Sequence, residues 1–106
     1  MYQLSVLVLN GCSLCQGLLT GLKEAGIDFE ELDADLNNEL ARKIERVVRT
    51  DYYPIAVLDL PQASTYFFRA DETERVGPIA LSNETVIVGC VNTNTMLQQI
   101  KILLNK

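Results

Sequence analysis

The alternation of apolar and polar residues along the chain predicts four strands and three helices. Short, nearly continuous apolar runs are typical of strands covered on both faces, and one alternating run predicts a more exposed strand. The predicted strands are residues 4–9, 27–32, 55–60 and 85–88. Apolar side chains that recur every three or four residues predict helices at 12–25, 36–49 and 92–106.

Residues near the helix ends support these boundaries. Gly26 is placed to end the first helix, Asp35 to cap the second and Asn92 to cap the third. Gly17 and Gly21 lie inside the first helix, where glycine is unfavourable. Either another element packs closely there, or the two glycines are tolerated weaknesses.

Between residues 61 and 84 the periodic pattern weakens. Strand-forming residues at 64–68 precede a charged segment and then the turn signal Gly77-Pro78. We interpret residues 61–84 as a hairpin-like insertion whose deletion leaves a folded domain. Tyr66, Phe67 and Phe68 are adjacent, so they cannot all face one side of a strand, and at least one needs cover in the core or on a partner.

Length and charge narrow the classes of protein. The 106 residues predict a single domain spanning 1–106, and the apolar runs are too short to span a membrane. A net charge of −5 repels phosphate backbones, so we expect no nucleic-acid partner. Three cysteines and an N-terminus without a basic lead indicate a protein of the reducing cytoplasm.

Cys12-Ser13-Leu14-Cys15 stands where the first strand gives way to the first helix. Free backbone N–H groups at a helix start favour a thiolate, which is the attacking species in disulfide exchange. A second thiol one turn later can resolve the mixed disulfide. Cys15 shares the inward apolar stripe and Cys12 lies at the exposed tip, so the pair predicts a two-electron redox couple.

The two cysteines could instead belong to a metal site or be neighbours by chance. The only further cysteine is Cys90 and the chain has no histidine, so one chain cannot supply four nitrogen or sulfur ligands for zinc. We therefore expect no metal. A permanent structural disulfide is disfavoured because a ring of this size restrains little of the unfolded chain. A non-catalytic domain in which the two cysteines are close by chance remains open.

The order of elements and three landmarks resemble the glutaredoxins and other small proteins of the thioredoxin-like superfamily. The landmarks are Cys12 to Cys15, Tyr53-Pro54 before the third strand, and Val88-Gly89-Cys90 before the last helix. The resemblance implies an α/β fold of order βαβαββα. Its four-stranded mixed sheet is flanked by three helices, and residues 61–84 form an insertion between the last two strands.

The same resemblance implies roles for individual residues. Cys12 is the nucleophile and Cys15 the resolving thiol of a thiol–disulfide oxidoreductase. Pro54 is a cis-proline beside the nucleophile, and the backbone of Tyr53 pairs with the substrate. The remaining substrate-binding positions, which match the family's glutathione cradle, are Gly89, Cys90 and Asn92. Cys90 also fits a simpler role as a small buried residue at a strand end.

The positions at which the chain departs from the glutaredoxin pattern bear on which reductant it uses. Leu9 stands where glutaredoxins have a lysine, Val91 where they have an aspartate, and Ser13-Leu14 where they usually have Pro-Tyr. We expect no bound cofactor and only weak binding of glutathione, unless Arg46 or Arg49 replaces the missing lysine. The predicted partners are a disulfide-containing protein and, as reductant, glutathione or a protein of the thioredoxin reductase type. We expect the oxidoreductase to be a monomer.

Two functions of other classes fit the same sequence. The fold could serve as an interaction domain that binds extended peptide in the groove near Tyr53. Alternatively, Cys12 and external thiols could hold an iron–sulfur cluster between two subunits, as in some glutaredoxins.

Overall fold

The structure, a computed structural model, describes residues 2–61, 64–70, 77–80 and 85–105, and the backbone alone for 77–80. No helix in these ranges is long and apolar enough to cross a membrane. The elements, in chain order, are β1 (Gln3–Val8), α1 (Ser13–Glu24), β2 (Glu30–Asp33), α2 (Asn38–Val48), β3 (Ile55–Asp59), β4 (Thr65–Ala70), β5 (Gly77–Ala80), β6 (Thr85–Cys90) and α3 (Thr93–Leu104).

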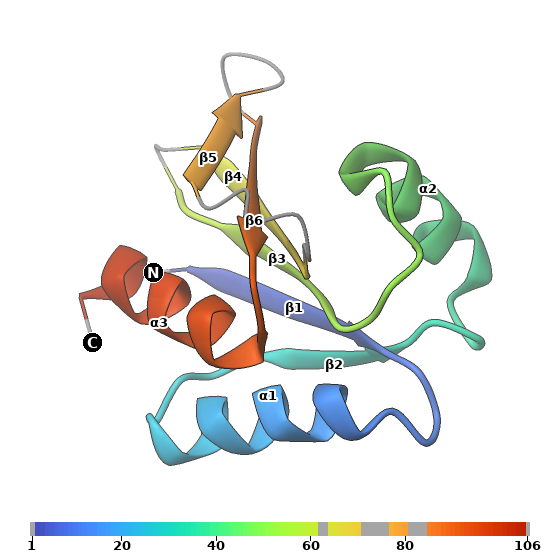
Figure 1. The fold of residues 1–106 in the computed structure, drawn as a ribbon, viewed down its shortest axis with the longest axis horizontal. Helices are drawn as coiled ribbons and strands as arrows, with labels where there is room; N and C mark the ends of the chain where they lie inside the picture. Colours follow the sequence, from blue (N-terminus) through green and yellow to red (C-terminus); the bar gives the residue numbers. More distant parts are fainter. Residues whose placement is uncertain (1, 62–63, 71–76, 81–84, 106) are drawn as a thin grey trace.

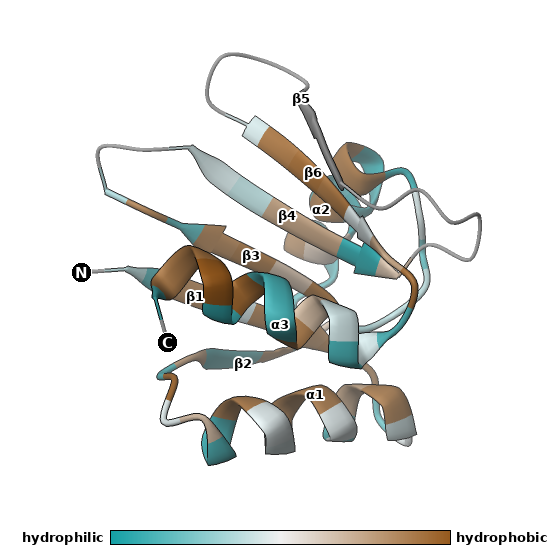
Figure 2. Ribbon diagram, turned by 60° about the vertical axis from the view of Figure 1, so that its left-hand side comes forward, coloured by the Kyte–Doolittle hydropathy of each residue, from teal (hydrophilic) through white to brown (hydrophobic). Residues whose placement is uncertain are grey.

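The strands form one mixed sheet in the order β2-β1-β3-β4-β6-β5 (Figure 1). The pairs β1–β2 and β4–β6 are parallel, while β1–β3, β3–β4 and β5–β6 are antiparallel. Helices α1 and α3 lie side by side on one face, and α2 covers the other (Figure 2). This α/β arrangement of a mixed sheet between helices is compatible with a thioredoxin-like fold.

The expected four-stranded sheet is wrong, because the described part of the chain contains six paired strands. The segment that we interpreted as an insertion between the last two strands contains β4. This strand pairs with β3 along one edge and with β6 along the other. Consecutive aromatic residues show no alternation of apolar and polar positions. The sequence pattern therefore could not reveal that β4 is a central strand. Residues 62–63, 71–76 and 81–84 of that interpreted insertion lie outside the described residues.

The three adjacent aromatics of β4 divide between the two faces of the sheet. Arg69 donates from Nη1 to the carbonyl of Val48 in α2 at 2.6 Å, so its side chain lies on the α2 face. Alternation along the strand places Phe67 on that face too, and Tyr66 and Phe68 on the face covered by α1 and α3. Phe68 is fully buried, which confirms that one of these aromatics is covered by the core.

Helix α1 lies against α3 at one of its two glycines. A Cβ atom added to Gly21 would lie 2.6 Å from Cδ2 of Leu97, whereas one added to Gly17 would meet nothing within 4 Å. The close approach predicted as one alternative is therefore confirmed at Gly21 only. The helix buries the face expected from the apolar stripe, namely Cys15, Leu18, Leu19 and Leu22.

The start of α2 differs from its prediction. Asp35 does not cap the helix; the N-cap is Asn37. Asp33 Oδ1 instead accepts hydrogen bonds from the N–H groups of Asp35 at 2.8 Å and Leu36 at 3.4 Å, closing a turn before the helix. Leu36 is thereby left 84% exposed, outside the buried face of Ala41, Ile44 and Val48. The sequence pattern did not indicate this turn, because Leu36 is an apolar residue next to the start of the helix and fitted its apolar face.

Replacing Phe68 with alanine should lower the free energy of unfolding by about 3–5 kcal/mol, since a fully buried ring leaves a cavity. Chemical denaturation of the oxidised protein measures this. The control is Ile102→Ala on the exposed side of α3, where the side chain is 66% exposed and the change should stay within about 0.5 kcal/mol.

Deleting residues 62–83 should unfold the protein, contrary to our expectation from the sequence, because the deletion removes β4 from between β3 and β6. A folded deletion variant, or a Phe68→Ala variant as stable as Ile102→Ala, would contradict a central position for this strand.

The two glycines of α1 form a matched pair for a second measurement. Gly17→Ala should stabilise the protein by about 1 kcal/mol, because alanine favours a helix and nothing obstructs its Cβ. Gly21→Ala should fall below that value by about 1–3 kcal/mol, since Leu97 has to move. Equal stabilisation at both positions would contradict a tight contact between Gly21 and the Leu97 side chain.

Candidate redox site

Cys12 and Cys15 form a disulfide with their Cα atoms 5.2 Å apart. Cys12 is the N-cap residue of α1, and Cys15 lies in the first turn. The Cys12 side chain is partly exposed, while Cys15 is fully buried. The predicted placement of one sulfur at the helix tip and the other on the inward face is confirmed.

The backbone before and after Cys12 holds its sulfur at the end of the helix. Gly11 adopts φ 78°, which side-chain-bearing residues rarely adopt, and this turn allows the Cys12 N–H to donate to the Leu9 carbonyl at 3.2 Å. The N–H of Cys15 donates to Cys12 Sγ at 3.1 Å. The first turn of α1 contains no acidic residue. A thiolate at this position would therefore be stabilised by a hydrogen bond and by the helix dipole.

Tyr53 and Pro54 lie opposite this sulfur. Their peptide bond is cis, as expected, and both residues are buried. The carbonyl oxygen of Tyr53 lies 3.9 Å from Cys12 Sγ, although the two residues are 41 positions apart in the chain. The fold thus brings together the two cysteines and the predicted substrate-binding residues Tyr53 and Pro54.

The Tyr53 ring reaches a charged pair on α2. Its hydroxyl donates to Glu45 Oε2 at 2.5 Å, and Arg42 Nη1 donates to both carboxylate oxygens of Glu45 at 2.8 and 2.9 Å. From the sequence, a four-residue spacing had paired Glu45 with Arg49. In the structure its carboxylate instead binds Arg42 and the Tyr53 hydroxyl, and no local signal indicates the contact with Tyr53.

These contacts shift the pKa values of both Glu45 and Tyr53. The hydrogen bond from Tyr53, together with Arg42, lowers the pKa of Glu45 below its ordinary value. Burial first, and then the carboxylate of Glu45, raises the pKa of Tyr53 far above its ordinary value. Glu45 therefore stays ionised and Tyr53 protonated over the whole neutral range, so the acceptor and the donor of their hydrogen bond are both retained.

A cavity of about 190 Å³ opens beside Tyr53. Its lining residues are Leu9, Ala34, Asp35, Arg42, Glu45, Asp51 and Tyr53. Leu9 is the position at which the resembled family has a lysine, and the arginine that lies nearby is Arg42, not the expected Arg46 or Arg49. The lining contains one arginine and three carboxylate residues, so its formal net charge is negative.

Gly89, Cys90 and Asn92 lie at the end of β6 and the start of α3. Gly89 and Cys90 pair with Arg69 and Ala70 of β4. Because β4 separates β6 from β3, these residues lie about 10 Å across the sheet from the strand that Pro54 precedes. The predicted binding role of the segment stays a prediction.

The side chains of the same segment have structural contacts. Asn92 Oδ1 accepts from the Thr95 N–H at 2.9 Å and so caps α3, as predicted. Cys90 is fully buried, and burial raises the pKa of its thiol to about 11. These properties match a small core residue at a strand end more closely than a reactive thiol.

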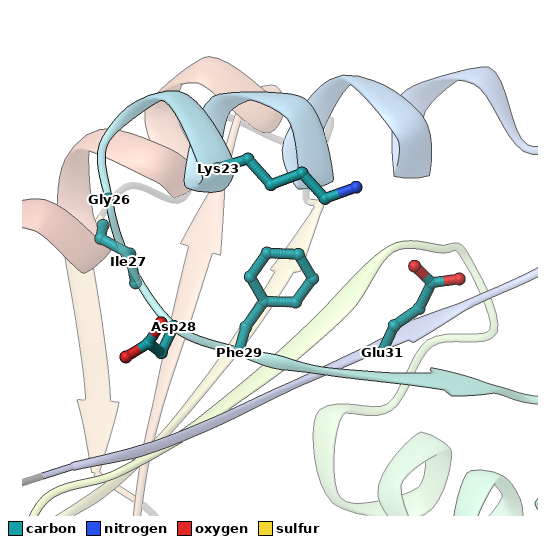
Figure 3. A pocket seen from close by; sticks show the side chains of 6 residues that line it. All are labelled: Lys23, Gly26, Ile27, Asp28, Phe29 and Glu31. Atoms are coloured by element: carbon teal, nitrogen blue, oxygen red, sulfur yellow. The ribbon is translucent and has the colours of Figure 1, made fainter.

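A larger, open cavity of about 470 Å³ lies at the other end of α1. Figure 3 shows the side chain of Lys23 extending above the ring of Phe29, with Glu31 on the same side. Lys23 is eleven residues after Cys12, which corresponds to about 16 Å along a helix. This cavity is therefore separate from the disulfide.

The comparisons with known proteins do not identify a family for this chain. No protein-family model matches the chain, and no curated protein sequence matches it. Within the described ranges, no three histidine, cysteine, aspartate or glutamate side chains come together as a group that could hold a metal ion. The Cys12–Cys15 pair at disulfide distance is consistent with redox activity.

In the reduced protein, Cys12 should be alkylated at neutral pH and Cys15 roughly tenfold or more slowly, because a buried thiol reacts only after local opening. Iodoacetamide labelling followed by peptide mass mapping measures both rates. Cys90 serves as an internal control, since it is buried and should remain unlabelled. Labelling of Cys15 before Cys12 would invert the two roles.

Proposed function

We propose that the protein is a thiol–disulfide oxidoreductase of the thioredoxin-like superfamily, resembling the glutaredoxins. The observation that carries the proposal is the pairing of a partly exposed Cys12 at a helix N-terminus with a fully buried Cys15 in a disulfide. The cis-proline beside the sulfur supports it. The chain order β1-α1-β2-α2-β3-β6-α3 agrees with the resemblance, with β4 and β5 lying between β3 and β6 in the chain.

The proposed reaction begins with the reduced protein. The Cys12 thiolate attacks one sulfur of a substrate disulfide, forming a mixed disulfide and releasing the other substrate sulfur as a thiolate. Cys15 then loses its proton and attacks Cys12 Sγ, which forms the Cys12–Cys15 disulfide and releases the second substrate thiol. Two electrons pass from the protein to the substrate. An external dithiol reverses these steps and restores the reduced pair.

A protein disulfide fits the site better than glutathione does. Glutathione is an anion, and the cavity beside Tyr53 offers Arg42 already paired with Glu45, together with Asp35 and Asp51. Val91 remains at the position of the family's aspartate and is 48% exposed. Two missing ion-pair partners would weaken glutathione binding by about a hundredfold or more.

An anaerobic coupled assay tests the function and the reductant together. With a model protein disulfide as substrate, turnover should be supported by thioredoxin and its reductase and poorly by glutathione and its reductase. Cys12→Ser should abolish turnover. Cys15→Ser should instead accumulate the mixed disulfide on Cys12, because nothing resolves it. Cys90→Ala tests the two roles of the buried third thiol: retained activity favours a small core residue, and lost activity in a folded variant favours a substrate-binding role.

The remaining outcomes distinguish the alternative functions. Efficient turnover with glutathione alone would restore an ordinary glutaredoxin. Binding of extended peptides without turnover by any reductant would favour an interaction domain. An iron–sulfur absorption spectrum in freshly purified protein, lost in Cys12→Ser, would favour a bridged cluster.

A further inference from the structure

We propose that Glu45 is a positioning residue that holds the carbonyl of Tyr53 against the Cys12 sulfur. The inference rests on the proposed function, because it concerns the same sulfur as nucleophile. It adds a residue from α2, on the opposite face of the sheet from α1, to a site so far built from α1 and the cis-proline segment.

A continuous series of contacts runs from α2 on one face of the sheet to Cys12 of the α1 side on the other. Arg42 Nη1 holds both oxygens of the Glu45 carboxylate, and Glu45 Oε2 accepts the hydroxyl proton of Tyr53 at 2.5 Å. The ring of Tyr53 is thereby fixed at its far end, and the residue is only 8% exposed. The backbone carbonyl of the same residue lies 3.9 Å from Cys12 Sγ. A ring held at its tip restrains the backbone to which it is attached.

The carbonyl of Tyr53 acts on Cys12 in the opposite sense to α1. Once the disulfide is reduced, the carbonyl can accept a hydrogen bond from the Cys12 thiol, and its dipole presents negative charge to a thiolate. Both effects favour the neutral thiol. The Cys15 N–H and the helix dipole favour the thiolate. Glu45 therefore moderates the ionisation of the nucleophile by keeping the opposing carbonyl in place.

Charged groups from three segments surround this path. Those that line the cavity with Tyr53 are Asp35 from the turn before α2, Arg42 and Glu45 from α2, and Asp51 from the segment before β3. Removing the charge of Glu45 would itself alter the local field. A variant that removes the charge but keeps a hydrogen-bond acceptor is therefore required.

The experiment measures the pH profile of Cys12 alkylation in the reduced protein. Tyr53→Phe and Glu45→Ala should each lower the apparent pKa of Cys12 by about half a unit, because each frees the carbonyl. Glu45→Gln retains an acceptor for the hydroxyl and should remain close to wild type. The double variant Tyr53→Phe/Glu45→Ala should shift no further than either single variant, since both changes remove the same hydrogen bond.

Two control variants make the same chemical changes outside the path. Tyr52→Phe alters the adjacent tyrosine, which is 67% exposed, and Glu39→Ala alters an exposed carboxylate of α2. Both should leave the pKa of Cys12 unchanged. Thermal melting of every variant separates a loss of stability from a change at the sulfur, because destabilisation alone does not shift a thiol pKa in protein that remains folded.

The outcomes separate the inference from the proposed function. Unshifted profiles in Tyr53→Phe and Glu45→Ala, additive shifts in the double variant, or equal shifts in Glu45→Gln and Glu45→Ala would each overturn the role of Glu45 as a positioning residue. A wild-type Cys12 that does not react at neutral pH would overturn the proposed function instead. Alkylation needs no substrate or reductase, so the two failures cannot be confused.

Discussion

The hydrogen bond from the Cys15 N–H to Cys12 Sγ, at 3.1 Å, is the interaction on which the site depends. It requires a helix that begins at Cys12 and buries Cys15, so that one sulfur meets free N–H groups and the other is covered. The packing of α1 satisfies this requirement. Leu18, Leu19 and Leu22 cover the sheet, and Gly21 lets α3 approach. The chemistry of two sulfurs is thus tied to the core of the fold.

The sheet supplies the other side of the site. β3 starts directly after Pro54, and its pairing with β1 and β4 keeps the cis-proline segment at the end of the sheet that faces Cys12. Tyr53 contributes twice, through a carbonyl near the sulfur and through a hydroxyl bound to Glu45. A segment of two residues therefore connects the helices on both faces of the sheet.

Local patterns in the sequence were sufficient to predict much of the redox site. The apolar stripe predicted that Cys15 is buried and Cys12 exposed, and Asn92 was recognised as a cap, because both depend on neighbours within one or two turns. The boundaries of β3 and α1 were predicted to within a residue or so for the same reason. The cis-proline came from the resemblance, which carried information that periodicity does not contain.

By itself, the sequence determined the dithiol, its helix and the strand before it, since hydrophobic period and capping act locally. The strand after the helix was predicted at 27–32 and lies at Glu30–Asp33. Only the tertiary structure decided that β4 is a central strand between β3 and β6, that Leu36 is exposed, and that Glu45 binds Tyr53. Strand pairing and the contact of α2 with Tyr53 are chosen by the packing of the whole core. A continuous aromatic segment fits an edge, a flap or a central strand equally well until its neighbours are known.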